Sequence, residues 1–266
     1  MEKGWALVTG ASEGLGREFA RLAASAGHSV ILAARNEARL RELAADLSAA
    51  HGVEALVLRA DLAEPGAAGR LWTEATADGR RISVLVNNAG FGRHGSFGAG
   101  GEVREAGSIA VNVTALTELM QVAVPHMRGH GGGRILNVAS TAAFMPGPGM
   151  AVYHATKAYV LSLSLAAAEE LRGTGVTVTA LCPGATATRF FADADMGETW
   201  LMRLTPVPGP APVAAAGWRA MLAGRPVAIT GWNNRVFAFL TRLVPRPFAA
   251  RLTRFFLSET GRPRPD

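Results

Sequence analysis

The sequence predicts an α/β fold built on a doubly wound, mostly parallel seven-stranded sheet with helices on both faces. Short runs of Val, Ile, Leu and Ala alternate with longer stretches of helical periodicity along most of the chain. Strands that are apolar on both sides are typical of a parallel sheet covered by helices. A glycine-rich segment follows the first apolar run, and ligands of such sheets bind beyond the carboxyl ends of the strands.

The expected elements alternate regularly. Strands are expected at residues 5–10, 29–34, 54–60, 82–88, 134–140, 176–182 and 227–230. Helices are expected at residues 14–27, 36–50, 65–79, 102–129, 151–173 and 212–223. The chain has 266 residues, of which 49% are hydrophobic, and we expect a single domain over residues 1–266 with a helical extension at its C-terminal end.

Cysteine usage and apolar runs predict the compartment. The single cysteine, Cys182, excludes an intramolecular disulfide and fits a reducing environment. The first apolar run begins at Trp5, which leaves no room for a signal peptide, and no uninterrupted apolar run is long enough for a membrane span. We therefore expect a cytoplasmic protein.

Positive charge is concentrated near the C-terminus. The formal net charge is +6, and residues 235–266 contribute seven arginines against Glu259 and Asp266. The preceding 234 residues carry 20 basic and 19 acidic groups, which is not the basic face of a nucleic-acid-binding domain. We therefore expect no nucleic-acid partner and treat residues 232–266 as a basic amphipathic extension of the same domain.

A dinucleotide site is expected where the first strand meets the first helix. The run TGASEGLG places Gly10, Gly14 and Gly16 at a helix entry, where backbone amides and the helix dipole favour a pyrophosphate. Ser12, Glu13 and Leu15 complete this loop. The alternative is an ordinary tight turn, which the position between strand and helix argues against.

The end of the second strand predicts which nicotinamide cofactor is preferred. An enzyme selective for NAD usually offers an acidic residue there to the ribose 2′-hydroxyl, but Ala34 occupies that place and Arg35 follows. A guanidinium suits a 2′-phosphate, so we expect NADP(H) to be preferred, with NAD(H) as the alternative. Arg35 as an ordinary solvated charge is the simpler interpretation, and Glu13 is an unfavourable neighbour for a phosphate.

Tyr153 and Lys157 are a candidate proton-transfer pair. The chain has only two tyrosines and two lysines, and one of each stands four residues apart in the run YHATKAY. On a helix these positions share a face. A nearby ammonium would lower the phenol pKa from about 10 into the neutral range, where it serves as a general acid or base. The alternative is an incidental aromatic beside a solvated lysine.

Several motifs in one order resemble a known family. They are the glycine loop, Asp61, the run NNAG at 87–90, Asn112, Ser140, the run YHATK at 153–157 and Pro183-Gly184. Together they resemble the short-chain dehydrogenase/reductase family, in its shorter single-domain branch, over roughly residues 4–231. The resemblance implies a Rossmann-type fold and an oxidoreductase that transfers hydride between a nicotinamide and a carbonyl or secondary alcohol.

The resemblance also implies a catalytic set of Asn112, Ser140, Tyr153 and Lys157. Ser140 would hydrogen-bond the substrate carbonyl and Tyr153 would donate the proton. Lys157 would in addition bind the nicotinamide ribose, and Asn112 would hold a water that relays protons. Taken alone, Ser140 at a strand end and Asn112 in a helix could equally be common polar residues without a catalytic role.

The family likeness implies further contacts with the cofactor and between subunits. Asp61 and Leu62 would contact adenine, whereas Asn87 would stabilise the central sheet. The other expected cofactor contacts are Asn88, Ala89, Gly90, Pro183, Gly184 and Thr188. A homodimer or homotetramer is also implied, with helices 102–129 and 151–173 at the contact.

Residues 189–211 are the expected substrate lid. Their apolar side chains could wall a pocket for a hydrophobic ketone, aldehyde or 3-oxoacyl derivative, or simply pack the lid onto the body. These side chains are Phe190, Phe191, Met196, Trp200, Leu201 and Met202. No metal site is expected, because His94 and His154 have no second ligand at metal spacing.

The extension has apolar residues at helical spacing with arginines between them. A basic amphipathic helix pair could contact a membrane surface peripherally or attract an acyl carrier. The alternative is a helix pair that closes the pocket or joins subunits. For the whole chain, the alternatives to a reductase are a catalytically idle NADP(H)-binding redox sensor and an epimerase or dehydratase of nucleotide sugars.

Overall fold

The strands of the described residues form one seven-stranded sheet in the order β3-β2-β1-β4-β5-β6-β7. The computed structural model describes residues 3–190, 194, 196, 199–200, 203 and 207–258. Every strand pairs with its neighbours in parallel. The doubly wound α/β prediction is confirmed, and the sheet is parallel throughout rather than mostly parallel.

The observed elements agree with the expected ones to within a few residues. The strands are β1 Trp5–Thr9, β2 Ser29–Ala34, β3 Ala55–Arg59, β4 Ile82–Asn87, β5 Gly133–Val138, β6 Val176–Cys182 and β7 Val227–Ile229. The helices before the extension are α1 Gly14–Ser25, α2 Glu37–His51, α3 Ala67–Thr76, α4 Glu102–Ile109, α5 Leu116–Gly129, α6 Ala151–Glu170 and α9 Pro210–Leu222. Short 3-10 turns are η1 Ala77–Gly79 and η3 Thr141–Phe144.

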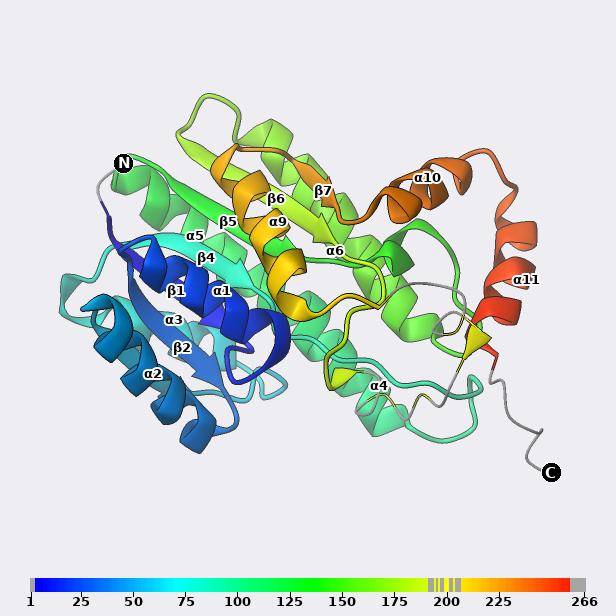
Figure 1. Ribbon diagram of the computed structural model, residues 1–266, viewed down its shortest axis with the longest axis horizontal. Coiled ribbons are helices and arrows are strands. Elements are labelled where there is room, and N and C mark those ends of the chain that lie inside the picture. The colour runs from blue at the N-terminus through cyan, green and yellow to red at the C-terminus, as the bar shows by residue number, and fades with distance from the viewer. Residues whose placement is uncertain are drawn as a thin grey trace.

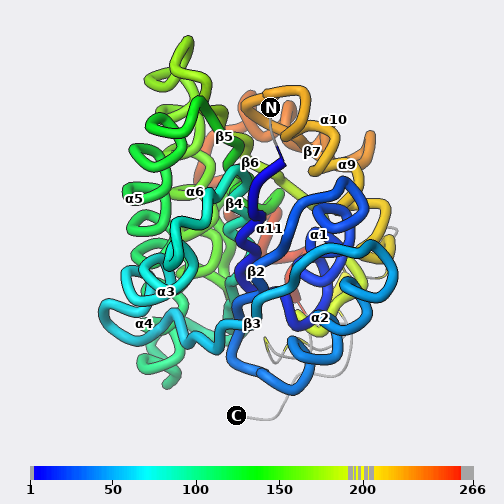
Figure 2. Tube along the Cα trace, turned by 90° about the vertical axis from the view of Figure 1, so that its left-hand side faces the viewer, coloured from blue at the N-terminus to red at the C-terminus, as the bar shows by residue number. Residues whose placement is uncertain are grey.

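Two helical layers enclose the sheet. In Figures 1 and 2, α1, α2 and α9 cover one face and α3 to α6 cover the other. The first layer contributes Phe19, Leu40 and Trp218 to a buried cluster that includes Val8 of β1. Side chains of α3, α5 and α6 form the second cluster on the opposite face. Because β1 to β6 are apolar toward both faces, both layers can exclude water from the sheet.

The expected helix at 102–129 is interrupted. Residues Ala110–Ala115 form a π-helical segment, η2, between α4 and α5. Such a wide turn inserts one residue into the helical ladder and is often found at functional sites. The whole stretch is long and apolar enough to cross a membrane, but α5 packs on α3, β4 and β5, as the core helix of a sheet layer does.

Two helices form the C-terminal extension, α10 Trp232–Leu240 and α11 Arg246–Leu257, which lie beyond β7 at one end of the molecule (Figure 1). α11 packs near the segment after β6: Leu257 shares a buried cluster with Met150, Ala194 and Met196. Of the expected lid residues, Phe191, Leu201 and Met202 lie outside the described residues, as do residues 259–266 of the extension.

Candidate active site

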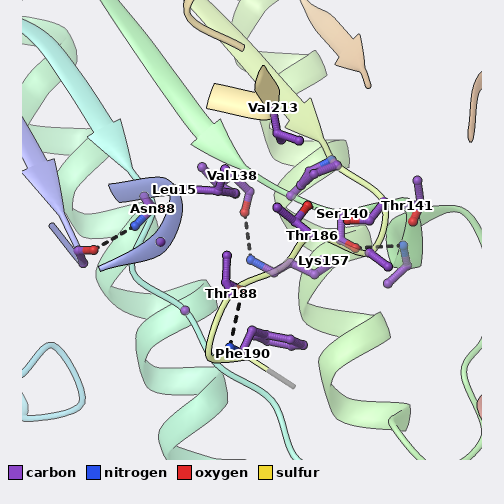
Figure 3. Close-up of a pocket in the computed structure, with 18 of the residues that line it drawn as sticks. Leu15, Asn88, Val138, Ser140, Thr141, Lys157, Thr186, Thr188, Phe190 and Val213 are labelled. Atoms are coloured by element: carbon purple, nitrogen blue, oxygen red, sulfur yellow. Dashed lines mark hydrogen bonds between the residues drawn. The ribbon is translucent and has the colours of Figure 1, made fainter. Parts of the chain in front are cut away.

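The carboxyl ends of β1 and β4 are joined by the buried hydroxyl of Thr9. Thr9 Oγ1 accepts hydrogen bonds from the backbone amides of Asn88 and Ala89, both at 3.0 Å, and donates to Val86 O at 3.3 Å. The Asn88 side chain donates back to Thr9 O at 2.9 Å and Gly10 O at 3.2 Å (Figure 3). β2 and β3 lie on one side of β1, and β4 to β7 lie on the other. The connections that follow β1 and β4 therefore run in opposite directions and leave a crevice at this edge of the sheet.

The glycine loop lets an anionic ligand approach its backbone closely. Gly10 and Gly14 have φ of +64° and +56°, a conformation that favours glycine. A Cβ on Gly10 would lie 3.0 Å from Ala89 Cα, and one on Gly14 would lie 3.2 Å from Thr188 Cγ2. α1 begins at Gly14, so its free amides face the loop. These features fit the pyrophosphate of a dinucleotide.

Gly16 has a packing role. A Cβ there would meet Gly10 O at 2.1 Å and Asn88 Nδ2 at 2.6 Å, so only glycine lets α1 approach the loop. Gly16 itself does not line the cleft. The other loop residues assigned to cofactor binding, Ser12, Glu13 and Leu15, all do.

The cleft has a volume of about 2540 Å³ and brings together most of the expected site residues. Figure 3 shows Leu15, Asn88, Ser140, Lys157 and Thr188 around it. The cleft also contains Gly10, Gly14, Arg35, Asp61, Leu62, Ala89, Gly90, Tyr153, Pro183 and Gly184. Residues from six strand ends therefore converge on one cavity, because a parallel sheet presents all its carboxyl ends at one edge.

Two arginines occupy the end of the cleft after β2. Arg35 is exposed there, and Arg39, in the first turn of α2, donates to Glu13 Oε2 at 2.7 Å. Arg189 Nε lies 3.8 Å from the same oxygen. Glu13 is thus paired with cations rather than left as a free anion in the loop. The sequence analysis missed Arg39, and its place in the first turn of the helix that follows the second strand was the available signal.

Tyr153 and Lys157 lie on the cleft side of α6, one turn apart. Lys157 is buried, and its ammonium donates to Val138 O at the end of β5 at 2.8 Å (Figure 3). Its Nζ lies 5.7 Å from the centroid of the Tyr153 ring. The interpretation of Lys157 as a solvated surface lysine is therefore wrong.

The pKa of Tyr153 differs from the sequence-based expectation. Burial raises the pKa of Tyr153 to about 12, and a hydrogen bond with Ser140 lowers it only in part. Burial also lowers the pKa of Lys157 to about 8. The ammonium is directed at Val138 O, and desolvation of the phenolate outweighs its attraction. Tyr153 is therefore fully protonated at neutral pH, which suits a proton donor.

Ser140 connects β5 to the turn η3. Its side chain accepts a hydrogen bond from Ala142 N at 3.1 Å and so caps η3. The same hydroxyl lowers the pKa of Tyr153 in part, and both residues line the cleft. Thr141 N donates to Pro183 O at 2.8 Å, which fixes this turn against the end of β6.

Asn112 lies beneath the cleft in the π-helical segment. Its Nδ2 donates to Phe91 O at 2.9 Å and Thr156 Oγ1 at 3.0 Å, and its Oδ1 accepts from Phe91 N at 3.1 Å. A Cβ on Gly90 would lie 2.9 Å from Oδ1 and 3.3 Å from Lys157 Nζ. Asn112 thus fixes the loop after β4 against α6, next to Lys157.

His154 braces the turn that carries Ser140. It is buried, its Nδ1 lies 2.9 Å from Met145 O, and Ala142 O is a second backbone partner. Burial lowers the pKa of His154, so the ring is neutral at physiological pH. His154 lines the cleft, and its hydrogen bond to Met145 also holds the turn in place. In the part of the chain that the structure describes, no group of three His, Cys, Asp or Glu could hold a metal ion.

The substrate side of Tyr153 is apolar. The Phe190 ring lies 5.0 Å from the Tyr153 ring between centroids, and both pack on the cluster of Met150, Met196 and Leu257. His94 Nε2 lies 3.2 Å from Leu257 O and ties the end of α11 to this wall. The wall beside the phenol can therefore hold an apolar group.

A family model for short chain dehydrogenase matches residues 4–198. The chain belongs to the short-chain dehydrogenase/reductase family. The Rossmann-type assignment of the sheet follows from the same match.

Two of the curated relatives are named as 3-oxoacyl reductases. The chain is 35% identical over 176 residues to a very-long-chain 3-oxoacyl-CoA reductase of Laccaria bicolor, covering 65% of this chain and 52% of the relative. It thus spans about half the length of that relative. It is 34% identical over 179 residues to a 3-oxoacyl-(acyl-carrier-protein) reductase of Staphylococcus aureus, covering 67% and 73%.

Solved structures of the family share the whole architecture. A short-chain dehydrogenase from Sphingobium yanoikuyae in complex with NADPH is 33% identical, with a TM-score of 0.80 over 90% of this chain and 93% of that one. A Burkholderia phymatum member in complex with NAD is 26% identical, with a TM-score of 0.81 over 98% of each. The family therefore includes members solved with either cofactor.

We predict that reductive turnover falls as the pH rises through about 8. Lys157 has a lowered pKa of about 8, so its ammonium is lost there, whereas the phenol of Tyr153 keeps its proton up to about pH 12. Loss of the cation removes stabilisation of the phenolate that forms when Tyr153 gives up its proton. Initial rates between about pH 6 and 10, at saturating cofactor, measure this.

The Lys157→Met variant is the control for this profile. It should be slow at every pH and show no inflection near pH 8. An inflection retained in Lys157→Met would assign the titration to another group and contradict the prediction.

Proposed function

We propose that this protein is an NADP(H)-dependent reductase of hydrophobic ketones, aldehydes or 3-oxoacyl derivatives. The observation that carries the proposal is that Tyr153 lines one cleft with Ser140 and Lys157 and packs on an apolar wall. Two relatives are named as 3-oxoacyl reductases, which supports the substrate class. The named activities are theirs, and their transfer to this chain is part of the proposal.

The residues of the crevice would hold the dinucleotide in an extended form. Gly10 and Gly14 with the start of α1 would receive the pyrophosphate, and Asp61 and Leu62 would contact the adenine. Pro183, Gly184 and Thr188 would flank the nicotinamide. When bound, the nicotinamide supplies the hydride for reduction or accepts it in oxidation.

The protein's own residues then manage the proton. The Ser140 hydroxyl donates a hydrogen bond to the substrate oxygen and positions the carbonyl. As the carbonyl π bond breaks and its carbon gains a hydride, the oxygen takes the proton of the Tyr153 hydroxyl. The phenolate that remains is stabilised by the ammonium of Lys157, 5.7 Å from the ring centroid, until solvent returns the proton.

Turnover of carbonyl compounds of graded chain length tests the reductase and its apolar pocket. We expect NADPH oxidation with kcat/KM rising by roughly twofold to fourfold per methylene until the pocket is full. Tyr153→Phe should lower kcat by about 10²- to 10⁴-fold, because it removes the proton donor while keeping the ring.

Tyr159→Phe is the matched control, since Tyr159 lies on the same helix and bonds Thr117 on the outer surface. It should retain normal turnover. A preference for small charged carbonyls would overturn the substrate class. NADPH binding without turnover of any compound would favour the redox sensor instead.

The pair Arg35 and Arg39 supports a preference for NADP(H). Both guanidinium groups line the end of the cleft after β2, where a 2′-phosphate would lie. Arg39 holds Glu13 in an ion pair at 2.7 Å, which reduces the repulsion between this carboxylate and a phosphate. A charge-assisted bond to phosphate would then favour NADPH over NADH.

The Arg35→Ala variant should weaken NADPH binding by roughly 10- to 100-fold and leave NADH binding nearly unchanged. Titration of both cofactors by fluorescence measures the two dissociation constants. Arg41→Ala, which removes an α2 arginine paired with Glu37, should change neither. Equal NADPH and NADH affinities in the unmodified protein would contradict the preference.

We further propose that the protein forms a homo-oligomer through α4, α5 and α6. Ile109, Val122 and Leu165 on these helices expose 36% to 45% of their surface, which suits a contact between two copies. Sedimentation equilibrium should give a dimer or tetramer. A monomer at every concentration would overturn this.

A further inference from the structure

The outer surfaces of α10 and α11 carry an unusual concentration of exposed apolar side chains. Of the fifteen large hydrophobic residues exposed among the described residues, eight lie between residues 232 and 255. We call them the C-terminal apolar surface. They are Trp232, Val236, Phe239, Leu240, Leu243, Phe248, Leu252 and Phe255.

Seven of these side chains form a stripe on each helix, and Leu243 lies between the two helices. On α10 they recur at intervals of four, three and one residues from Trp232, and on α11 at intervals of four and three from Phe248. Such spacing places them on one side of a helix. Trp232, Phe239 and Leu243 are 74%, 60% and 68% exposed.

Only positive charge accompanies the surface. Residues 232–258 contain Arg235, Arg242, Arg246, Arg251 and Arg254 and no Asp or Glu. All five arginines are exposed. Long arginine side chains beside an apolar stripe can lay their stems on it and extend the guanidinium groups toward anions.

The opposite side of α11 is committed to the active-site cleft. Ala249, Thr253 and Leu257 are buried, and Thr253, Phe256 and Leu257 line the cleft. The Trp200 and Phe255 rings are stacked with centroids 5.8 Å apart. The helix is therefore held in place by its buried side, and of its outer stripe Phe255 is half covered by Trp200 whereas Phe248 remains 58% exposed.

We propose that the C-terminal apolar surface docks the protein peripherally on an anionic lipid membrane. The apolar stripes enter the boundary between headgroups and acyl chains, and the five arginines bind the lipid phosphates. Because α11 is also a wall of the cleft, docking brings the cleft next to the acyl chains. An apolar carbonyl compound then enters from the lipid; this second step rests on the proposed reductase function.

Charge favours a membrane over a second copy of this chain as the occupant. A two-fold contact places the same patch of both copies face to face. The arginines of residues 232–258 would then meet those of the other copy without a single carboxylate from either segment. An anionic bilayer supplies both the apolar phase and the counter-charge.

Co-sedimentation of the full chain with vesicles tests docking. Vesicles of phosphatidylcholine with phosphatidylglycerol should bind the protein, and those of phosphatidylcholine alone should bind it at least about tenfold more weakly. The combined variant Arg242→Gln, Arg251→Gln and Arg254→Gln should lose on the order of 100-fold in partitioning. Phe239→Ser with Leu243→Ser should lose binding to both vesicle types.

Matched controls remove the same charge and apolar area elsewhere. Arg41→Gln, Arg70→Gln and Arg172→Gln replace arginines paired with Glu37, Glu64 and Glu169. Phe97→Ser with Val103→Ser replaces exposed apolar residues outside the extension. Both controls should bind like the unmodified protein. Docking is overturned by absent binding, by equal binding to neutral vesicles, or by equal losses in the controls.

Self-association is measured in the same samples by sedimentation velocity. Self-association that Phe239→Ser with Leu243→Ser abolishes, together with absent vesicle binding, would assign the surface to a second copy and overturn the proposal.

Turnover and vesicle binding are measured separately, so they test the reductase and the docking independently. A short, water-soluble carbonyl compound reports the reductase without vesicles, whereas vesicle binding requires no turnover. Failure of one measurement therefore leaves the other intact. If both succeed, the unmodified protein should reduce a long-chain 3-oxo compound carried in anionic vesicles at least about tenfold faster than the combined arginine variant does. Equal rates would overturn entry from the lipid.

Discussion

The geometry of the active site depends on the hydrogen bonds of the Thr9 hydroxyl. This hydroxyl joins the last residue of β1 to three backbone groups at the end of β4, and it is almost fully buried. Through it the two strands that diverge into opposite halves of the sheet keep a fixed separation at the crevice. The glycine loop and the loop after β4 are positioned relative to each other by this one side chain.

The burial of Lys157 is the main electrostatic cost of the site. Taking an ammonium out of water is unfavourable, which is why its pKa falls to about 8. The hydrogen bond to Val138 O compensates in part and directs the charge at the end of β5. The protein thus holds a cation beside a neutral phenol, an arrangement whose benefit appears when the phenol loses its proton.

In the C-terminal extension, the two sides of α11 have different surroundings. The inner side of α11 completes the apolar wall beside Tyr153 through Leu257, and its outer side carries Phe248, Leu252 and Phe255. The body of the protein covers the inner of these two sides, and the proposed membrane contact covers the outer one.

Sequence alone determined the sheet, the order of its elements and the identity of the polar residues around the cleft. These depend on local patterns: apolar runs fix strands, glycine spacing fixes the loop, and a pair four residues apart fixes a helix face. Arg35 could be placed in the same way, because it directly follows a strand.

Tertiary structure alone decided what surrounds each group. The raised pKa of Tyr153 follows from burial by Phe190 and its neighbours, which sequence does not count, and not from the nearby charge of Lys157. Thr9 and Arg39 take their roles from partners that are 80 and 26 residues away along the chain. His154 takes its role from Met145, at the end of η3. Burial and long-range partners are properties of the packed chain, so local patterns cannot supply them.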